Sequence, residues 1–411
     1  MTHPSTRSSP RSGANRQPAP AAKPTPGSRL APLLLGLGVA LPSFAQAATW
    51  LVGPDTPYPR ISDVCRQARD GDTIDILPGE YRADVCVWRQ KQLTLRGIGE
   101  RPVLIADGKI AEGKAIWVMR NGNFLVDNIE FRGARAKGGN GAGIRHEHGH
   151  LEVRNSHFID NQMGLLTANF DDTELIVRDS LFANAPRQQS PLPHLLYVGR
   201  IKRFEISGSR FHQGHYGHLI KSRARRNDIR YNLLYDSAGG EASYEIDLPN
   251  GGHSVIIGNI IGQSASTQNP AVIAYGAEGP IWPDSALYLA HNTLLSDRLS
   301  GTWFLRTFTD KLPADTRIIG VNNLSVGIGA FTLTASGEFS GNIPLPPGAL
   351  HDPATLDFRP RGASLLRSLS SSAGEIDGID LRPSAEFSLP LGTRPLPPDQ
   401  VLLPGAVQTI D

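Results

Sequence analysis

Short segments in which apolar and polar residues alternate recur through residues 126–324. Successive side chains of a β-strand point to opposite faces, so alternation of this kind predicts strands with one buried face. One apolar column recurs every 23 to 33 residues and comprises Val126, Val153, Val177, Ile206, Ile229, Ile256, Leu289 and Ile319. Five residues further on lies a second column, made of Phe131, Phe158, Phe182, Phe211, Leu234, Ile261, Leu294 and Leu324. Between them, three positions after the first, stand Ser156, Ser180, Ser209, Asn232, Asn259, Asn292 and Asn322.

Another alternating strand precedes each of these segments. Its apolar anchors are Ile144, Leu166, Leu196, Ile220, Ile246, Ile273 and Leu305. A unit of two or three short strands cannot bury its inner face alone, whereas stacked units form a continuous core. The L-x-x-L-x-L spacing of a leucine-rich horseshoe is absent, and no repeat carries a helical stretch. Irregular repeat lengths instead fit a parallel β-helix, in which loops leave at the corners.

The start of the repeats also indicates this architecture. The segment "RISDVCRQARDG" predicts a short helix with Ser62 as N-cap, and "GDTIDILPGEY" follows as the first strand segment. Together with the columns, this start resembles the right-handed parallel β-helix, or pectate-lyase-like, superfamily over residues 50–343. The resemblance implies an all-β solenoid with an N-terminal capping helix, and activity toward polysaccharides.

Three regions are expected along the chain. Residues 1–47 have a basic start, a short apolar run over Leu30–Leu41 and a small-x-small site at Ala45–Gln46–Ala47, as a signal peptide does. The β-helix would then occupy residues 48–343, and residues 344–411 would form a closing segment and a proline-rich tail. Because the apolar run is too short to cross a bilayer, we expect a periplasmic or secreted monomer without a membrane span after cleavage.

The net charge bears on which binding partners are expected, and the cysteine content bears on a disulfide. Removal of the leader removes five basic residues and no acid, which takes the net charge from +2 to −3. No global attraction to nucleic acid remains, so nucleic acid is excluded as a partner. Cys65 and Cys86 are the two cysteines of the chain. In an exported protein they are expected to form a disulfide, although two buried thiols are the alternative.

Charged residues concentrate next to the anchors of the preceding strand. Strand alternation turns these neighbours outward, and stacking brings successive repeats within about 4.8 Å. One outer patch is therefore predicted from Arg145, Glu147, Asn169, Tyr197, Lys221, Arg223, Glu245 and Asp247, with Arg306 further along. His194 and His218 fall at inward positions, where they would stack or turn toward the patch. The alternative is a solvated face on which opposite charges such as Lys221 and Asp247 simply pair.

A cationic patch on an exported β-helix suits an acidic polysaccharide. In lyases of the superfamily, β-elimination at a uronate needs a neutralised carboxylate, a base for the C5 proton and an acid for the C4 oxygen. The expected base is Lys221, with its pKa lowered by Arg223 and Arg145. Arg223 would bind the carboxylate, and Tyr197 or His218 would be the acid. Substrate binding is assigned to Arg145, Glu147, Asn169, His194, Glu245, Asp247 and Arg306.

Calcium is the one cofactor that this patch suggests. The carboxylates of Glu245 and Asp247 could hold Ca²⁺ as hard oxygen ligands, or could instead fix Lys221 and Arg223. "RHEHGHL" contains alternate histidines, but His146 would point inward and too few ligands converge for zinc.

Other functions remain open. A polysaccharide-binding or assembly protein without catalysis would need the same charge. A glycoside hydrolase needs paired carboxylates, for which Asp171 and Asp172 are candidates in a turn, but the N-T-D strand of the β-helical hydrolases is absent. A uronate C5-epimerase of this fold would carry a D-P-H-D strand, which is also absent.

Overall fold

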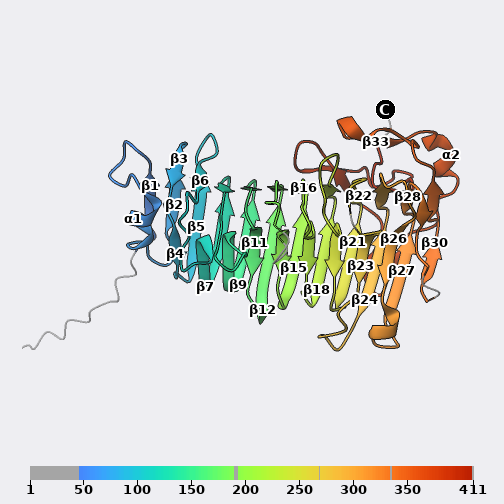
Figure 1. Cartoon of the computed structure of the whole chain (residues 1–411), viewed down its shortest axis with the longest axis horizontal. Helices are drawn as coiled ribbons and strands as arrows, with labels where there is room; N and C mark the ends of the chain where they lie inside the picture. The colour runs from blue at the N-terminus through green and yellow to red at the C-terminus, as the bar shows by residue number, and fades with distance from the viewer. Residues whose placement is uncertain (1–45, 189–192, 268, 334–335, 410–411) are drawn as a thin grey trace, which may run out of the picture. The chain divides into compact units, whose positions relative to one another are not determined.

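The computed structural model describes residues 46–188, 193–267, 269–333 and 336–409. Three stacks of parallel strands wind into a coil (Figure 1). The first face consists of β4 (Cys86–Trp88), the first parts of β7 (Ala115–Asp127) and β9 (Ala142–Arg154), β11 (Met163–Thr167), β14 (His194–Val198), β17 (Ile220–Ser222), β20 (Ile246–Leu248), β23 (Ala271–Tyr275), β26 (Thr302–Thr307) and β29 (Gly329–Ala330).

The other two faces complete each coil. The second face consists of β1 (Thr49–Val52), β2 (Thr73–Ile76), β5 (Gln92–Gly97), the second parts of β7 and β9, β12 (Phe170–Arg178), β15 (Ile201–Ser207), β18 (Arg226–Arg230), β21 (His253–Ile257), β24 (Ala286–Ala290), β27 (Arg317–Val321) and β30 (Glu338–Ser340). The third consists of β3 (Glu80–Arg82), β6 (Val103–Ile105), β8 (Glu130–Arg132), β10 (His157–Ile159), β13 (Leu181–Ala183), β16 (Arg210–His212), β19 (Leu233–Tyr235), β22 (Ile260–Gln263), β25 (Thr293–Ser296), β28 (Leu324–Val326) and β31 (Ile343–Leu345). The predicted parallel β-helix is confirmed.

Both apolar columns lie inside the coil as far as Leu289 and Leu294, as the alternation predicted. Val153 pairs with Val177, and Ile229 pairs with Ile256 on the second face. On the third face the rings of Phe131, Phe158, Phe182 and Phe211 stack in sequence, with centroids 5.2, 4.7 and 4.7 Å apart. These side chains are almost fully buried. The core is therefore a continuous apolar column that runs through successive coils.

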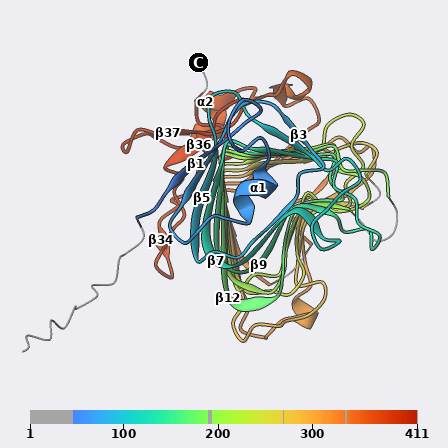
Figure 2. The same ribbon diagram turned by 90° about the vertical axis from the view of Figure 1, so that its left-hand side faces the viewer.

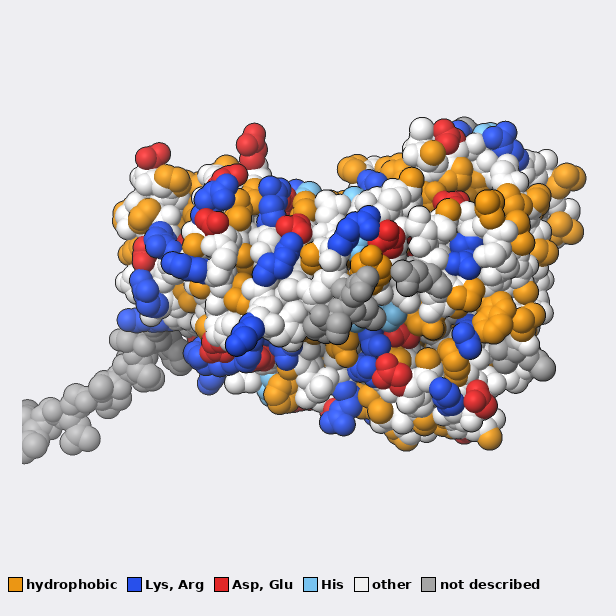
Figure 3. Space-filling view, in the orientation of Figure 1, with side chains coloured by type: hydrophobic (Ala, Val, Ile, Leu, Met, Phe, Trp, Pro, Cys, Tyr) orange, Lys and Arg blue, Asp and Glu red, His pale blue; other side chains and the backbone are white. Residues whose placement is uncertain are grey.

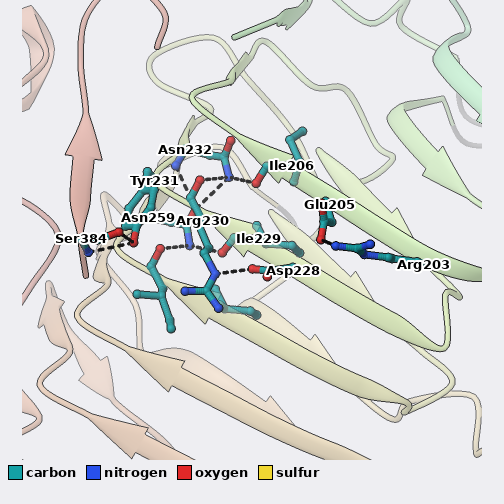
Figure 4. A network of polar contacts seen from close by, with 12 residues as sticks. Arg203, Glu205, Ile206, Asp228, Ile229, Arg230, Tyr231, Asn232, Asn259 and Ser384 are labelled. Carbon is teal, nitrogen blue, oxygen red and sulfur yellow. Dashed lines mark hydrogen bonds and ion pairs between the residues drawn. The ribbon is translucent and has the colours of Figure 1, made fainter. Parts of the chain in front are cut away.

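The serine and asparagine column satisfies the backbone at the corner between the second and third faces (Figure 4). Asn259 Oδ1 accepts a hydrogen bond from the backbone N–H of Asn232 at 2.9 Å, and its Nδ2 donates to the carbonyl of Ile229 at 2.8 Å. The same contacts repeat from Asn232 to Asn342 through Asn292 and Asn323. Because strand pairing does not supply partners at a corner, each side chain replaces a missing backbone bond.

Two register predictions were wrong by one residue. In the last coils the column uses Asn323, because Asn322 takes the left-handed conformation (φ 54°) that precedes each column residue. Gly320 and Ser325, not Ile319 and Leu324, therefore pair with the columns there. On the first face, Leu165 rather than Leu166 pairs with the inward Ile144 and Leu196. Leu166 consequently points outward and packs against Val118 and Tyr197 in a small apolar cluster.

A five-residue helix, α1 (Ile61–Cys65), lies at the N-terminal end of the coil (Figure 2). Ile61 and Val64 are fully buried in the main core. The first turn is capped from the following coil by Asp84, whose carboxylate accepts hydrogen bonds from the backbone N–H groups of Ile61 and Ser62 at 2.6 and 3.0 Å. The prediction of Ser62 as N-cap was therefore wrong. Cys65 and Cys86 form the expected disulfide, with Cα atoms 6.3 Å apart.

The C-terminal segment packs along the second and third faces (Figure 1). Its elements are β32 (Leu350–Asp352), η2 (Pro353–Thr355), β33 (Asp357–Pro360), α2 (Ala363–Arg367), β34 (Glu375–Ile376), β35 (Ile379–Asp380), β36 (Ala385–Phe387) and β37 (Thr393–Pro395), while η1 (Thr309–Lys311) lies earlier, after β26. Tyr231 Oη accepts a hydrogen bond from the backbone N–H of Ser384, and Tyr288 Oη donates to Asp377.

Most of the expected signal peptide, residues 1–45, lies outside the described residues. Within the described part of the chain, no helix is long and apolar enough to cross a membrane.

Candidate functional site

Tyr197, Lys221 and Asp247 lie side by side on the first face, as predicted. Strand pairing matches Tyr197 of β14 with Lys221 of β17, and Lys221 with Asp247 of β20. The three side chains therefore stand on consecutive coils about 4.8 Å apart, although two further strands lie between each pair along the chain. Their side chains point outward from the coil, because the adjacent Leu196, Ile220 and Ile246 point into its core.

Lys221 is held between two carboxylates. Its Nζ lies 3.0 Å from Asp247 Oδ2 and 3.0 Å from Glu278 Oε1. Burial acts to lower the pKa of Lys221, but the two carboxylates outweigh burial and raise it. The expectation of a pKa lowered by nearby arginines was therefore wrong, because Asp247 and, to a smaller extent, Glu278 contact the ammonium directly. Lys221 is therefore a cation in this arrangement.

Arg223 is the centre of a second set of contacts, one position beyond β17. Its Nε donates to Tyr197 Oη at 2.9 Å, and its Nη1 contacts both Asn250 Oδ1 and, at 2.6 Å, Glu278 Oε2. The indole of Trp282 donates to the backbone carbonyl of Arg223 at 3.0 Å. Although burial lowers the pKa of Arg223, the hydrogen bonds with Glu278 and Tyr197 outweigh burial and raise it. The guanidinium is thus a permanent, oriented cation beside the tyrosine.

Glu278 is the site residue that the sequence did not reveal. It lies in the loop that joins β23 to β24, with glycines of positive φ at positions 276 and 279. Burial acts to raise the pKa of Glu278, but the hydrogen bonds from Arg223 and Lys221 lower it to about 2. The insertion "GAEGPIWPDS" could have marked a corner loop, but nothing in it indicated that the loop folds back over the first face.

His194 and His218 stack against each other with centroids 4.8 Å apart, and Tyr244 continues the stack at 5.0 Å from His218. The Nδ1 of His194 accepts the backbone N–H of His218, and the Nδ1 of His218 accepts that of Tyr244. Each ring is therefore neutral with its proton on Nε2. Burial lowers the pKa of His194 to about 3 and that of His218 well below its usual value. Neither ring is an effective acid at neutral pH, which argues against the expected acid role of His218.

The carboxylate of Asp247 contacts this stack as well as Lys221. Its Oδ2 lies 3.4 Å from His218 Nε2, and its Oδ1 is buried without a hydrogen-bond partner among the described residues. Burial raises the pKa of Asp247, while Lys221 opposes that rise. His218 and Lys221 together hold the Asp247 carboxylate in place.

Glu245 does not lie on the outer face, which corrects the prediction. Its residue is fully buried, and neither carboxylate oxygen has a hydrogen-bond partner among the described residues. Burial raises its pKa well above the usual value, with a further rise from nearby Asp236. Glu245 and Asp247 therefore do not form the suggested calcium pair. Within the described residues, no three His, Cys, Asp or Glu side chains converge as metal ligands.

Arg145 and Glu147 lie on the N-terminal side of the site, two coils from Tyr197. Leu166 stands between Arg145 and Tyr197 in the outer column. Glu147 is bound by Lys114 at 2.8 Å and Arg120 at 2.6 Å, and these hydrogen bonds lower its pKa although burial opposes them. Arg145 is half-buried, and burial lowers its pKa. This network is separate from the contacts of Lys221.

Asn169 and Arg306 were both predicted to bind substrate, but their contacts differ from each other. The Oδ1 of Asn169 accepts the backbone N–H of Arg200 at 2.7 Å, so that this side chain stabilises the corner after β11. Arg306 lies on the C-terminal side, paired through Ala274 with Asp247 in the outer column. Its guanidinium lies 4.4 and 4.6 Å from the ring centroids of Trp303 and Phe308. It has no ion pair with any described residue, which leaves its charge available to a ligand.

The residues considered for glycoside hydrolysis or zinc binding lie outside the cluster around Lys221. Asp172 pairs with His148 at 2.8 Å and Asp171 with Arg200 at 2.7 Å. His146 is fully buried and points inward, as expected, and burial lowers its pKa to about 4. Over the visible side of the molecule, acidic and basic side chains are interspersed rather than segregated (Figure 3).

We call the five residues Tyr197, Lys221, Arg223, Asp247 and Glu278 the first-face cluster. Two cations in it bind a single carboxylate, one through each oxygen, and a phenol lies within hydrogen-bond distance of one cation. An arrangement of this kind can bind an external carboxylate and transfer a proton next to it.

Comparison with solved structures agrees with this fold. A pectate lyase, Pel9A, matches with a TM-score of 0.54 over 88% of this chain and 96% of its own, at 12% identity. An alginate lyase from Paenibacillus sp. str. FPU-7 matches with a TM-score of 0.48 over 73% of this chain and 98% of its own, at 14% identity. No protein-family model and no curated protein sequence matches the chain. The likeness to Pel9A shows the fold alone: the chain is a parallel β-helix similar to that of this pectate lyase.

Proposed function

We propose that this protein is an exported lyase that cleaves an acidic, uronate-containing polysaccharide by β-elimination. The observation that supports the proposal is the binding of the Glu278 carboxylate by Lys221 and Arg223, at 3.0 and 2.6 Å. The carboxylate of a uronate is the same chemical group, and Arg and Lys side chains would recognise it by the same contacts. We infer that a sugar carboxylate takes the position of Glu278.

The proposed reaction removes the C5 proton of the uronate. That proton is poorly acidic until its carboxylate is neutralised, and Arg223 is the fixed cation that would do this. For this step Lys221 would first release its ammonium proton to solvent, and the neutral amine would then accept the C5 proton. As C4=C5 forms and the C4–O bond breaks, Tyr197 would donate its proton to the leaving oxygen. Arg223 already donates to Tyr197 Oη, so that the hydroxyl proton is free for this transfer.

The polymer would run along the first face, perpendicular to its strands. Arg145 lies two coils from Tyr197 on one side, and Arg306 lies two coils from Asp247 on the other. The charges of a polyuronate recur on a similar length scale to the coils. Arg306, with the rings of Trp303 and Phe308, would bind a sugar beyond the cleavage site.

The test is incubation of the mature protein with a panel of polyuronates, followed by ultraviolet absorbance of the unsaturated ends. We expect absorbance with one polymer, with loss of at least about 100-fold in rate for Arg223→Lys, since the lysine ammonium cannot reproduce the planar group whose Nε binds Tyr197 while its Nη1 binds the carboxylate. New reducing ends without absorbance would indicate hydrolysis instead. Full activity of both Arg223→Lys and Lys221→Ala would contradict the assignment of the site.

A non-catalytic polysaccharide-binding protein is the second candidate. The observation in its favour is the raised pKa of Lys221, to which Asp247 contributes more than Glu278 does. A lysine that stays protonated binds anions but does not remove protons. Retained binding of a polyuronate, without absorbance or new reducing ends for any polymer of the panel, would support this alternative.

A further inference from the structure

The carboxylate subsite of the first-face cluster is occupied by the protein itself. Glu278 contacts Lys221 and Arg223 with one oxygen each, and it comes from a corner loop instead of a strand of the coil. Its side chain keeps 46% of its exposure, whereas that of Lys221 keeps 11%. The cations are thus part of the rigid face, while the carboxylate reaches them from the solvent side.

The backbone around Glu278 is anchored, so its side chain can move without the loop. The backbone N–H of Glu278 donates to the carbonyl of Pro249 at 2.8 Å, and Asn250 Nδ2 donates to the carbonyl of Gly279 at 2.9 Å. Trp282 is 9% exposed, and its indole N–H donates a hydrogen bond to the backbone carbonyl of Arg223. Rotation about the side-chain bonds of Glu278 toward solvent would therefore open the subsite at little cost to the fold.

We propose that Glu278 is a specificity-determining residue, an internal competitor that a ligand must displace with a carboxylate of its own. This inference rests on the proposed binding of a uronate by Lys221 and Arg223. A neutral sugar offers no charge to replace that of Glu278, and its binding would leave Arg223 without this ion pair and Lys221 with Asp247 alone. An anionic sugar restores both ion pairs. Glu278 thus excludes neutral or esterified polysaccharides and weakens the binding of acidic ones.

The experiment compares wild type with Glu278→Gln and Glu278→Ala. Asp284→Asn is the matched control, because Asp284 lies in the same loop, is 51% exposed and pairs with Arg225 at 3.0 Å, away from the subsite. Calorimetry would measure the Kd of a uronate oligosaccharide, of the polymer that binds wild type, and of its carboxyl-reduced, neutral counterpart. If the open state is about one tenth of the population, release of the competitor should lower the Kd of the acidic oligosaccharide about tenfold. Asp284→Asn should leave it unchanged.

A second measurement needs no polysaccharide. The rate at which an arginine-directed dicarbonyl reagent modifies Arg223, followed by peptide mass analysis, should rise severalfold in Glu278→Gln and not in Asp284→Asn. Equal Kd values for wild type and both Glu278 variants, or weaker binding by the variants, would overturn the competitor role while the proposed function stands. If no polyuronate binds any of these proteins, the result contradicts the proposed function, because that function requires binding of a uronate. An unchanged modification rate of Arg223 would overturn the inference by itself.

Discussion

The ammonium of Lys221 lies 3.0 Å from Asp247 Oδ2 on the next coil, and both groups are largely removed from water. Each charge of this pair stabilises the other, because either charge alone would be buried there without enough water to solvate it. Asp247 in turn contacts the neutral ring of His218. A change in the charge of Lys221 or Asp247 should therefore alter both the stability of the coil and the charge of the proposed site.

Loss of Lys221 should therefore destabilise the protein. We expect Lys221→Met to lower the free energy of unfolding by about 3 kcal/mol, because Asp247 remains buried without its cation. Chemical denaturation would measure this change. The double variant Lys221→Met/Asp247→Asn should recover most of the loss, and additive losses in the double variant would contradict the coupling.

Stability should fall as pH rises through the range in which buried carboxyl groups ionise. Burial raises the pKa of Asp236 to about 7 and that of Glu245 well above its usual value. Between the unfolded and folded pKa values, the folded state binds more protons than the unfolded state, so that stability decreases with pH. The slope should be about 1.4 kcal/mol per pH unit for each group. For Asp236 this window extends from about 4 to about 7.

Glu245→Gln tests the sign of this effect. The variant should be more stable than wild type at pH 7 and should show a shallower loss of stability between pH 5 and pH 7, followed by urea denaturation at each pH. Asp284→Asn, an exposed acid, should not alter the slope. A steeper slope in Glu245→Gln would mean that the carboxylate is ionised in the folded protein.

Substitution of the asparagine column should destabilise the coil according to the lost backbone contacts. Asn259→Ala leaves the N–H of Asn232 and the carbonyl of Ile229 without their side-chain partners. We expect a loss of about 3 kcal/mol in the free energy of unfolding. Asn259→Ser should lose less, because serine holds the same position at Ser209 and accepts the N–H of Ser180. Similar losses for both variants would show that packing, not hydrogen bonding, determines the cost.

The disulfide at the N-terminal end should contribute to stability through the loop that it closes. Cys65 and Cys86 are 21 positions apart. The loop-entropy model predicts a loss of about 3 kcal/mol in Cys65→Ser/Cys86→Ser, measured by denaturation of both proteins. Reduction of the wild type should produce the same loss. An unchanged stability would indicate that α1 does not form part of the cooperative unit.

If the protein is a lyase, Tyr197→Phe should separate proton transfer from binding. Removal of the hydroxyl should lower kcat about 100-fold or more with little change in KM, because the ring and Arg223 remain in place. Tyr235→Phe is the matched control, since the Tyr235 hydroxyl bonds Asp297 on the third face. A change confined to KM would instead assign Tyr197 to binding.

The sequence by itself determined the coil, because its alternation and the serine and asparagine spacing state which residues face inward. The same periodicity placed Tyr197, Lys221 and Asp247 in one row, and the register confirms it. Where two similar residues adjoin, as in Asn322–Asn323 and Leu165–Leu166, the pattern did not distinguish them. Only the backbone conformation and the strand pairing did.

Tertiary structure alone decided the chemistry of the site. Alternation describes strands, so it could not place Glu278, which reaches Lys221 and Arg223 from a corner loop. Nor could it show that Glu245 is enclosed in the coil or that His218 is held neutral by a backbone N–H. Protonation depends on which groups lie within a few ångströms and on how much water remains. Loops and burial set both, and neither follows from the period of the strands.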